Sequence, residues 1–225
     1  MVRIQFYAHA SFRLEGDGLT VITDPYRPDV AKYEPINEPA DIVLMSSHND
    51  LYHCDPTHIT GAPIIVNTLA LDSAGETIKG LHVKPFPAME NTYGPLQPRD
   101  PDDNAMYHFT LDGIRILHLG DIGHAIRDEQ LQALKGQVDI MLCLTGDFYS
   151  ISLTDLDDAI RMIEPKIVIP MHYNNDRCPL EVYPVTEFTK RYPQERVSWV
   201  KDTAIELDQS DLPEEMKIFV LEESR

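Results

Sequence analysis

The sequence has few cysteines, few basic residues and no long apolar run. Its three cysteines, at positions 54, 143 and 178 of 225 residues, are too few and too widely spaced for a disulfide framework or for paired CxxC zinc motifs. Nineteen basic residues stand against 37 acidic ones, which gives a net charge of −18. Because no patch gathers the Lys and Arg residues, such a surface repels nucleic-acid phosphates and anionic lipids. We therefore expect no membrane partner and no nucleic-acid partner.

The apolar residues come in short runs. Segments such as 138–144 and 167–170 are far shorter than the ~20 residues of a membrane-spanning helix. The first four residues do not resemble the apolar stretch of a signal peptide. A content of 43% hydrophobic and 25% charged residues is typical of a globular chain. We expect a cytoplasmic protein that forms a single domain over residues 1–225.

Short β-rich runs dominate the first half of the chain, and strands alternate with helices in the second half. The predicted strands are 2–7, 11–15, 19–23, 41–45, 63–66, 81–86, 105–111, 114–119, 138–144, 166–170 and 197–200. The predicted helices are 128–134, 154–163 and 185–191. No Gly- or Ser-rich linker divides the chain, so the pattern predicts one layered α/β protein.

One segment of the first half is similar to one of the second half. Residues 12–24 and 109–121 each read as a hairpin that turns at an Asp-Gly pair and whose return strand ends in Asp. A further apolar strand that begins with Asp-Ile follows each hairpin, at 41–45 and at 139–144. This repetition predicts two pseudo-symmetric halves, each built as a β-β-(α)-β unit.

Polar side chains stand directly after several of the predicted strands. These post-strand residues are Asp24, His48, Asp121, Asp147 and His172. The ends of buried strands meet at one edge of a sheet, where loops gather and ligands bind. Imidazole and carboxylate groups are ligands of zinc, manganese and iron. The pattern predicts a metal site at this edge, since the alternative, that each residue only caps a turn, would have to hold five times.

As a set, these motifs resemble those of the metallo-β-lactamase-fold hydrolases, in particular the small enzymes related to ascorbate-6-phosphate lactonases. The matching segments are His9 to Phe12, Thr23 to Tyr26, Ser47 to Asp55, His118 to His124, Gly146 to Tyr149 and Ile167 to Tyr173. They occur in the order that the family has. The resemblance implies a four-layer αββα sandwich of two pseudo-symmetric halves, which the internal repeat also suggests.

The resemblance also implies a set of metal ligands. The family's His-x-His-x-Asp-His motif falls on His48, Asp50, Tyr52 and His53, so two of its four positions are changed. The next family ligand falls at Glu90, while Asp121 matches a carboxylate that bridges two metals and His172 matches the last ligand. Because oxygen ligands shift preference from zinc toward manganese or iron, we expect one or two divalent transition metals, either Zn, Mn or Fe.

A metal site of this kind favours hydrolysis. A divalent cation lowers the pKa of its bound water toward about 7 and polarises a carbonyl or phosphoryl oxygen. We therefore expect a metal-dependent hydrolase that uses metal-bound water on a small-molecule substrate, either an ester, a lactone, an amide or a phosphoester. Tyr52 stands where relatives have an orienting Asp, so Asp50 or Asp121 would have to serve as the base.

Several residues keep two interpretations. His124 either contacts substrate as a proton donor or is a solvated loop residue, and Tyr149 either binds an oxyanion or packs as an aromatic ring. Asp24 either orients a ligand imidazole or caps a turn, and His9 matches a family position near the site. Asp147 is a substitute ligand or a cap. His118 lies inside an apolar run and is expected to be a core residue, whereas Cys54 lies between His53 and Asp55 and is the cysteine closest to the candidate ligands.

Two other functions compete with hydrolysis of a small molecule. The first is a catalytically impaired protein that keeps the fold as a ligand-binding or assembly module, which the replacement at Tyr52 favours. The second is nuclease activity, which the net charge of −18 disfavours. A homo-oligomer is a further expectation, because the related lactonases assemble.

Overall fold

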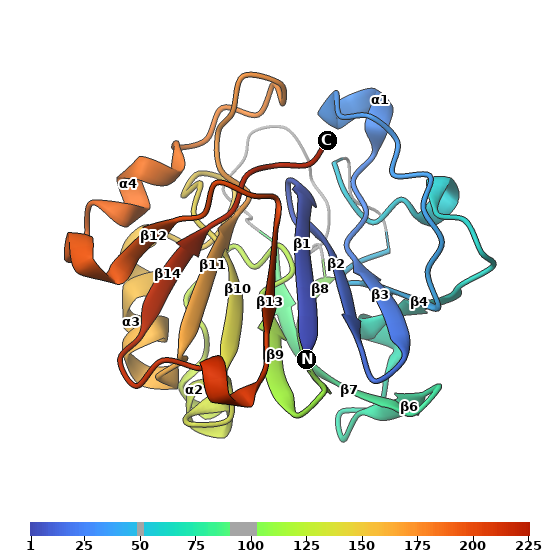
Figure 1. Ribbon diagram of the computed structural model, residues 1–225, viewed down its shortest axis with the longest axis horizontal. Coiled ribbons are helices and arrows are strands. Elements are labelled where there is room, and N and C mark those ends of the chain that lie inside the picture. The colour runs from blue at the N-terminus through green and yellow to red at the C-terminus, as the bar shows by residue number, and fades with distance from the viewer. Residues whose placement is uncertain (49–51, 91–102) are drawn as a thin grey trace.

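Two mixed β-sheets pack face to face (Figure 1). The computed structural model describes residues 1–48, 52–90 and 103–225. The first sheet has the order β13 (Ala204–Leu207), β1 (Val2–Ala8), β2 (Ser11–Gly16), β3 (Leu19–Thr23), β4 (Ile42–Met45) and β5 (Ile64–Asn67). The second has the order β12 (Val197–Trp199), β14 (Lys217–Val220), β11 (Ile167–Met171), β10 (Ile140–Leu144), β9 (Ile114–His118), β8 (Asp103–Leu111), β7 (Leu81–Met89) and β6 (Glu76–Ile78).

Five strands of each half repeat one pairing pattern. In the first half, β1, β2 and β3 are antiparallel neighbours, and β3, β4 and β5 are parallel neighbours. In the second half, β7, β8 and β9 are antiparallel, and β9, β10 and β11 are parallel. The predicted pseudo-symmetry is therefore present in the strand pairing itself.

The two predicted Asp-Gly hairpin turns lie against each other. Asp17 and Gly18 join β2 to β3, Asp112 and Gly113 join β8 to β9, and all four residues have positive φ angles, as a type I′ turn requires. The backbone N–H of Asp17 donates to Oδ2 of Asp112 at 3.1 Å, and the N–H of Asp112 donates to Oδ2 of Asp17 at 2.7 Å. This reciprocal pair joins the two halves at the lower end of the sandwich in Figure 1.

A second equivalent pair, Asp41 and Asp139, precedes β4 and β10 at the same end. Asp41 accepts a hydrogen bond from the N–H of Thr20 at 3.0 Å, and Asp139 accepts one from the N–H of Arg115 at 2.8 Å. The Arg115 guanidinium also donates through Nε and Nη2, at 2.9 and 2.6 Å. Burial acts to raise the pKa of Asp139, but the hydrogen bonds from Arg115 outweigh it and hold the pKa below its usual value.

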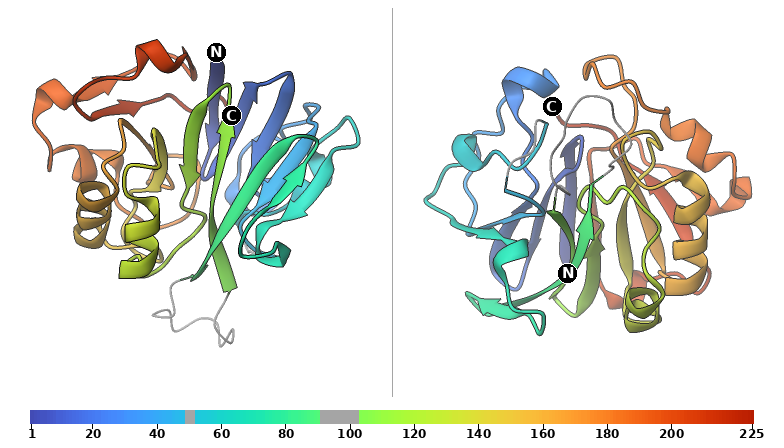
Figure 2. Two further views of the ribbon diagram at one scale, coloured as in Figure 1. Left: turned by 90° about the horizontal axis from the view of Figure 1, so that it is seen from below. Right: turned by 180° about the vertical axis from the view of Figure 1, so that it is seen from behind.

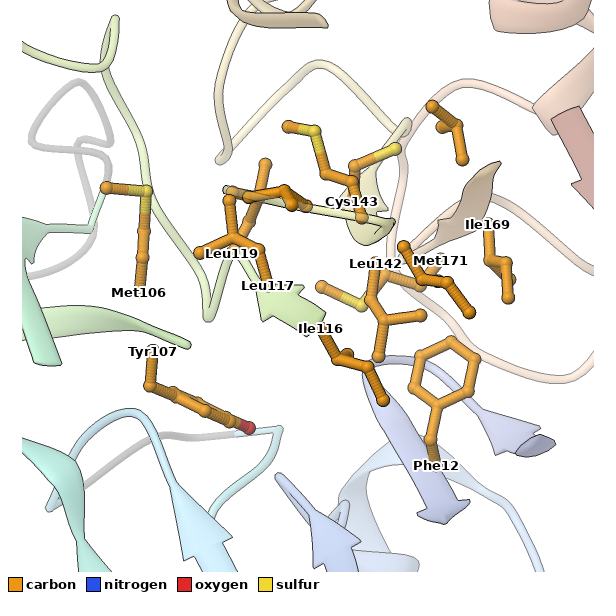
Figure 3. Close-up of a cluster of buried hydrophobic side chains, with 14 of the residues drawn as sticks. Phe12, Met106, Tyr107, Ile116, Leu117, Leu119, Leu142, Cys143, Ile169 and Met171 are labelled. Atoms are coloured by element: carbon orange, nitrogen blue, oxygen red, sulfur yellow. The ribbon is translucent and has the colours of Figure 1, made fainter. Parts of the chain in front are cut away.

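The central strands are buried on both faces, which is why they read as unbroken apolar runs. Successive side chains of a strand point to opposite faces. In β3 and β4, one set faces the main core between the sheets, namely Val21, Ile42 and Leu44. The alternate set, Ile22, Val43 and Met45, faces a smaller core on the outer side. Figure 3 shows the main core, where Phe12 of the first sheet lies beside Ile116 and Ile169 of the second.

Helices form the outer layers unequally. These are α1 (Pro28–Ala31), α2 (Asp128–Leu134), α3 (Leu153–Ile163) and α4 (Val185–Thr189). α2 and α3 cover the second sheet (Figure 2), and the N-cap Ser152 accepts a hydrogen bond from the N–H of Asp155 at 3.1 Å. The outer layer of the first sheet consists of α1 and loops. The predicted four-layer arrangement is confirmed. Within the described ranges, no helix has the length and apolarity to cross a membrane.

Four elements differ from the prediction in ways that have a physical reason. β7 was predicted to end at residue 86, yet it continues past Pro85 and Pro87 to Met89. β6 pairs only with residues 81–83, and the remainder of β7 is hydrogen-bonded on one side only, to β8. Proline has no backbone N–H group, and a strand with one unpaired side tolerates that lack. The short strands β6, β13 and β14 were not predicted, because charged residues interrupt their apolar pattern.

Candidate metal centre

Several ionisable side chains meet at the edge of the sandwich opposite the hairpin turns. The strands that carry most of them end at the upper edge in Figure 1. Five of them follow strands that run toward this edge: His9 after β1, Asp24 after β3, Glu90 after β7, Asp121 after β9 and His172 after β11. His53 comes from the loop after β4. Three of the five post-strand residues named from the sequence, Asp24, Asp121 and His172, are therefore among these side chains, and both halves contribute.

Asp121 lies between two buried imidazoles. Its Oδ2 is 3.4 Å from Nε2 of His53, and its Oδ1 is 3.8 Å from Nε2 of His172. The ligand atoms of His53, Glu90 and Asp121 all lie within 4.8 Å of one another. The two histidines are 1% and 3% exposed. We call His53, Glu90, Asp121 and His172 the ligand group.

The ligand group suits a divalent cation. Within the described ranges, Oδ1 of Asp121 is buried and accepts no hydrogen bond, and burying a carboxylate oxygen without a donor is costly. Two imidazoles and two carboxylates form a donor set that zinc, manganese and iron all accept. A cation beside Oδ1 would remove the penalty, so the residues present fit a metal.

Asn104 connects three parts of the edge and was not predicted. Its side-chain N–H groups donate to Oγ of Ser46 at 3.2 Å and to Oε1 of Glu90 at 3.4 Å. Its Oδ1 accepts from the backbone N–H of Asp121 at 3.1 Å. Gly120 makes this approach feasible, because a Cβ at that position would lie 2.4 Å from Oδ1 of Asn104. Asn104 directly precedes the predicted strand 105–111, and nothing in its sequence context distinguishes it from a loop residue.

His9 packs against the ligand group. Its ring centroid is 4.4 Å from that of His172 and 5.6 Å from that of His53. Its carbonyl oxygen accepts the backbone N–H of His172 at 2.7 Å. Both residues have positive φ angles, 57° and 53°, and this uncommon conformation lets each chain segment turn sharply as it leaves its strand.

The structure does not bring every predicted ligand into the group. His48 is exposed, and among the described residues its ring nitrogens belong to neither group of possible metal ligands, Asp24, His53 and Cys54 or His53, Glu90 and Asp121. Asp50 lies outside the described residues. Tyr52 is half-buried, with its ring centroid 5.9 Å from that of His9.

His124 uses both ring nitrogens for backbone contacts. Nδ1 donates to the carbonyl oxygen of Ala125 at 2.7 Å, and Nε2 accepts the N–H of Met89 at 3.1 Å. Because the N–H of Gly123 also donates to the carbonyl oxygen of Met89 at 2.9 Å, this loop holds the end of β7. His124 therefore positions the residue before Glu90 in this arrangement, and it is not part of the ligand group.

Three further predicted residues lie around this edge. Tyr149 is 44% exposed on the loop after β10. Asp147, in the same loop, accepts the N–H of Leu153 at 3.0 Å and so caps α3. His118 donates from Nε2 to the carbonyl oxygen of Ala10 and accepts the N–H of Gly120 at Nδ1, each at 2.9 Å. Burial lowers the pKa of His118, which makes it a neutral core residue, as expected.

The sequence profile of the beta-lactamase superfamily domain matches residues 3–172. The chain belongs to the beta-lactamase superfamily. Its fold, two mixed sheets between helical layers, is the metallo-β-lactamase fold. A crystal structure of a metallo-beta-lactamase superfamily protein from Thermotoga maritima superimposes with a TM-score of 0.76 and 26% identity, over 98% of both chains.

Curated members of the superfamily align with most of this chain. The UPF0173 metal-dependent hydrolase of Thermoplasma acidophilum is 30% identical over an alignment of 196 positions, which covers 77% of this chain and 84% of that protein. The UPF0173 metal-dependent hydrolase of Archaeoglobus fulgidus is 28% identical over 200 residues, with the same two coverages.

Proposed function

We propose that this superfamily member hydrolyses a small ester, lactone, amide or phosphoester, with a divalent cation held by the ligand group. The enzyme class, a metal-dependent hydrolase, is supported by the superfamily and by the names of the curated relatives. The lactone option is supported by the motif resemblance described above. Zinc, manganese and iron are the candidate metals.

One observation carries the proposal. Asp121 is a nearly buried carboxylate whose two oxygens face the Nε2 atoms of two different buried histidines, at 3.4 and 3.8 Å. A buried carboxylate beside two imidazole nitrogens favours a positive charge between them, which protonated imidazoles or a metal cation can supply. A cation bound by His53, Asp121 and His172 would activate water and polarise the oxygen of a scissile carbonyl or phosphoryl group.

The remaining residues of the edge assist this chemistry. Glu90 is half-buried, whereas Asp121 is 9% exposed, so Glu90 is the carboxylate of the ligand group that solvent reaches more easily. Asn104 holds Oε1 of Glu90 and the backbone of Asp121 in one arrangement. The rigid contacts around β7 and His124 keep Glu90 at the end of its strand.

The test compares Asp121→Asn with Asp147→Asn after purification without chelator. Asp121→Asn removes a charged ligand, and we expect metal content and hydrolysis of a panel of simple esters, lactones, amides and phosphodiesters to fall by about 100-fold or more. Asp147→Asn changes an acidic residue that follows a neighbouring strand but lies outside the ligand group. This variant should keep both the metal content and the hydrolytic rate of the wild type. Metal content and initial rates are the measurements.

Wild-type protein that gains no zinc, manganese or iron, even when each is added in excess, would contradict the proposal. It would favour the module that binds a ligand or a partner without catalysis. Bound metal without hydrolysis of any member of the panel would contradict the substrate classes named here.

A further inference from the structure

Cys54 lies directly behind the ligand group. Its Sγ is 3.2 Å from Nδ1 of His53, the ring nitrogen that faces away from Asp121. The same sulfur is 3.6 Å from Oδ1 of Asp24, and Oγ of Ser47 donates to it at 3.7 Å. Asp24 is fully buried, and Cys54 is 8% exposed. The thiol therefore occupies the space between a candidate ligand and a buried carboxylate.

The backbone around Cys54 fixes this placement. Arg27 N–H donates to the carbonyl oxygen of Tyr52 at 2.7 Å, and Asp55 N–H donates to the carbonyl oxygen of Pro25 at 2.9 Å. These two bonds bracket the pair His53 and Cys54 and tie it to the segment that follows Asp24. A φ angle of 62° at Cys54 is uncommon for a residue with a side chain, and such conformations persist where the surroundings impose them.

The directions of these hydrogen bonds are consistent with one protonation pattern. The thiol donates its S–H to Oδ1 of Asp24, which leaves the sulfur lone pairs as acceptors. Sγ can then accept Nδ1–H from His53. That choice places the proton of the neutral imidazole on Nδ1 and leaves a lone pair on Nε2, toward Oδ2 of Asp121.

We propose that Cys54 is a positioning residue that selects the Nδ1–H tautomer of His53 and thereby keeps Nε2 available for the cation. The inference rests on the proposed function, because it assigns a role in the same metal centre. Partners of this kind orient a ligand imidazole, and their loss typically lowers metal affinity about 10- to 100-fold. Carboxylates and backbone carbonyls are the usual partners, whereas here a thiol transmits the effect of Asp24.

The test uses Cys54→Ala, Cys54→Ser and the control Cys178→Ala. Cys178 is buried to the same 8% exposure in the smaller core, so its replacement reports the general cost of losing a buried thiol. We expect Cys54→Ala to lower the affinity for zinc by about 10- to 100-fold. Cys54→Ser should recover most of that loss, because a hydroxyl can also accept from Nδ1–H and donate to Asp24, and Cys178→Ala should bind as tightly as the wild type.

The tautomer of His53 is measured separately, by ¹⁵N NMR of metal-free protein with labelled histidine, using His53→Gln to assign the signal. Wild type and Cys54→Ser should show a protonated Nδ1 and a bare Nε2, whereas Cys54→Ala should lose this preference. Cys54→Val, which also lacks a polar atom, replaces the alanine variant if that variant does not fold. This measurement needs no substrate, so it fails or succeeds independently of the proposed hydrolysis.

Two results would overturn the proposal. One is an unchanged tautomer and unchanged zinc affinity in Cys54→Ala or Cys54→Val. The other is a thiolate-to-metal charge-transfer band in the cobalt-substituted wild type that disappears in Cys54→Ser, because it would make Cys54 a ligand. Asp24, His53 and Cys54 have ligand atoms within 4.8 Å of one another, so this second result is a real alternative.

Discussion

The two ends of the sandwich are built from the same strands, but the aspartates at one end differ in their hydrogen bonding from Asp121 at the other. At the hairpin-turn end, Asp17, Asp112, Asp41 and Asp139 each accept a hydrogen bond from a backbone N–H group. At the ligand end, Oδ1 of Asp121 is buried and accepts no hydrogen bond from the described residues. The turn end therefore stabilises the protein without a metal, whereas the proposed cation would complete the ligand end, which is a common compromise at functional sites.

Of the tests of this contrast, removal of the metal should change the stability of the folded protein most. A cation present at about 100 times its dissociation constant stabilises the folded state by about 2.7 kcal/mol, which corresponds to roughly 5–10 °C in Tm for a chain of this size. Chelator should therefore lower the Tm of the wild type in differential scanning calorimetry. Asp121→Asn, which lacks a ligand, should show little response, and equal melting of wild type with and without chelator would break the comparison.

Substitution at the turn end should have the next largest effect. Asp139→Asn removes the charge that pairs with Arg115 and leaves that guanidinium with weaker partners. Because the Arg115 side chain is 36% exposed, we expect a loss near the low end for such pairs, about 2 kcal/mol in the free energy of unfolding. Urea denaturation of metal-free protein measures it, and Asp121→Asn should be neutral or stabilising in the same assay. The reverse order for the two variants would contradict the assignment of the two ends.

The smallest predicted effect concerns Glu223, which reaches the ligand end from the C-terminal tail. Asn175, three residues after His172, donates to Oε1 of Glu223 at 2.6 Å. Burial raises the pKa of Glu223 to about 7, so the fold favours its protonated form. This contribution to stability is complete below the unfolded pKa of about 4.3 and is lost as the pH rises through about 7.

Glu223→Gln should remove this pH dependence, because glutamine stays neutral. The free energy of unfolding of the variant minus that of the wild type should increase between pH 5 and pH 8. We expect an increase of about 1 kcal/mol, because the partial exposure of the side chain weakens the effect. Chemical denaturation of both proteins at the two pH values measures the difference. An equal gap at both pH values would show that Glu223 does not titrate in this range.

The sequence predicted the repeated strands well, because burial on both faces leaves a strong apolar signal. The run 140–144 and the Asp-Gly turns are examples, and so is the position of Asp121 after its strand. The repeat was less exact than the sequence suggested. If Asp41 and Asp139 are aligned, Thr23 of β3 is equivalent to His118 of β9, so Asp24 and Asp121 differ by two positions.

The inner contacts of the site could not be predicted in the same way. Asn104 contacts residues that are distant in sequence, and the placement of Cys54 depends on its positive φ angle. Neither feature leaves a periodic signal in the sequence. For His124, spacing alone gave no ring contacts, and the structure shows its two ring nitrogens hydrogen-bonded to the backbone of Met89 and Ala125. Spacing therefore located the edge, whereas side-chain direction depends on tertiary packing.

The reciprocal bonds between Asp17 and Asp112 have the form of an isologous interface, in which residue i of one subunit meets residue j of the other and the reverse is also true. Here both partners belong to one polypeptide, so their association is intramolecular and does not weaken on dilution. The ligand group lies across the same divide, with His53 in one half and Asp121 in the other. In effect the chain is a covalently linked pseudo-dimer whose ligand group is shared between its two protomer-like parts, and neither part can assemble that group alone.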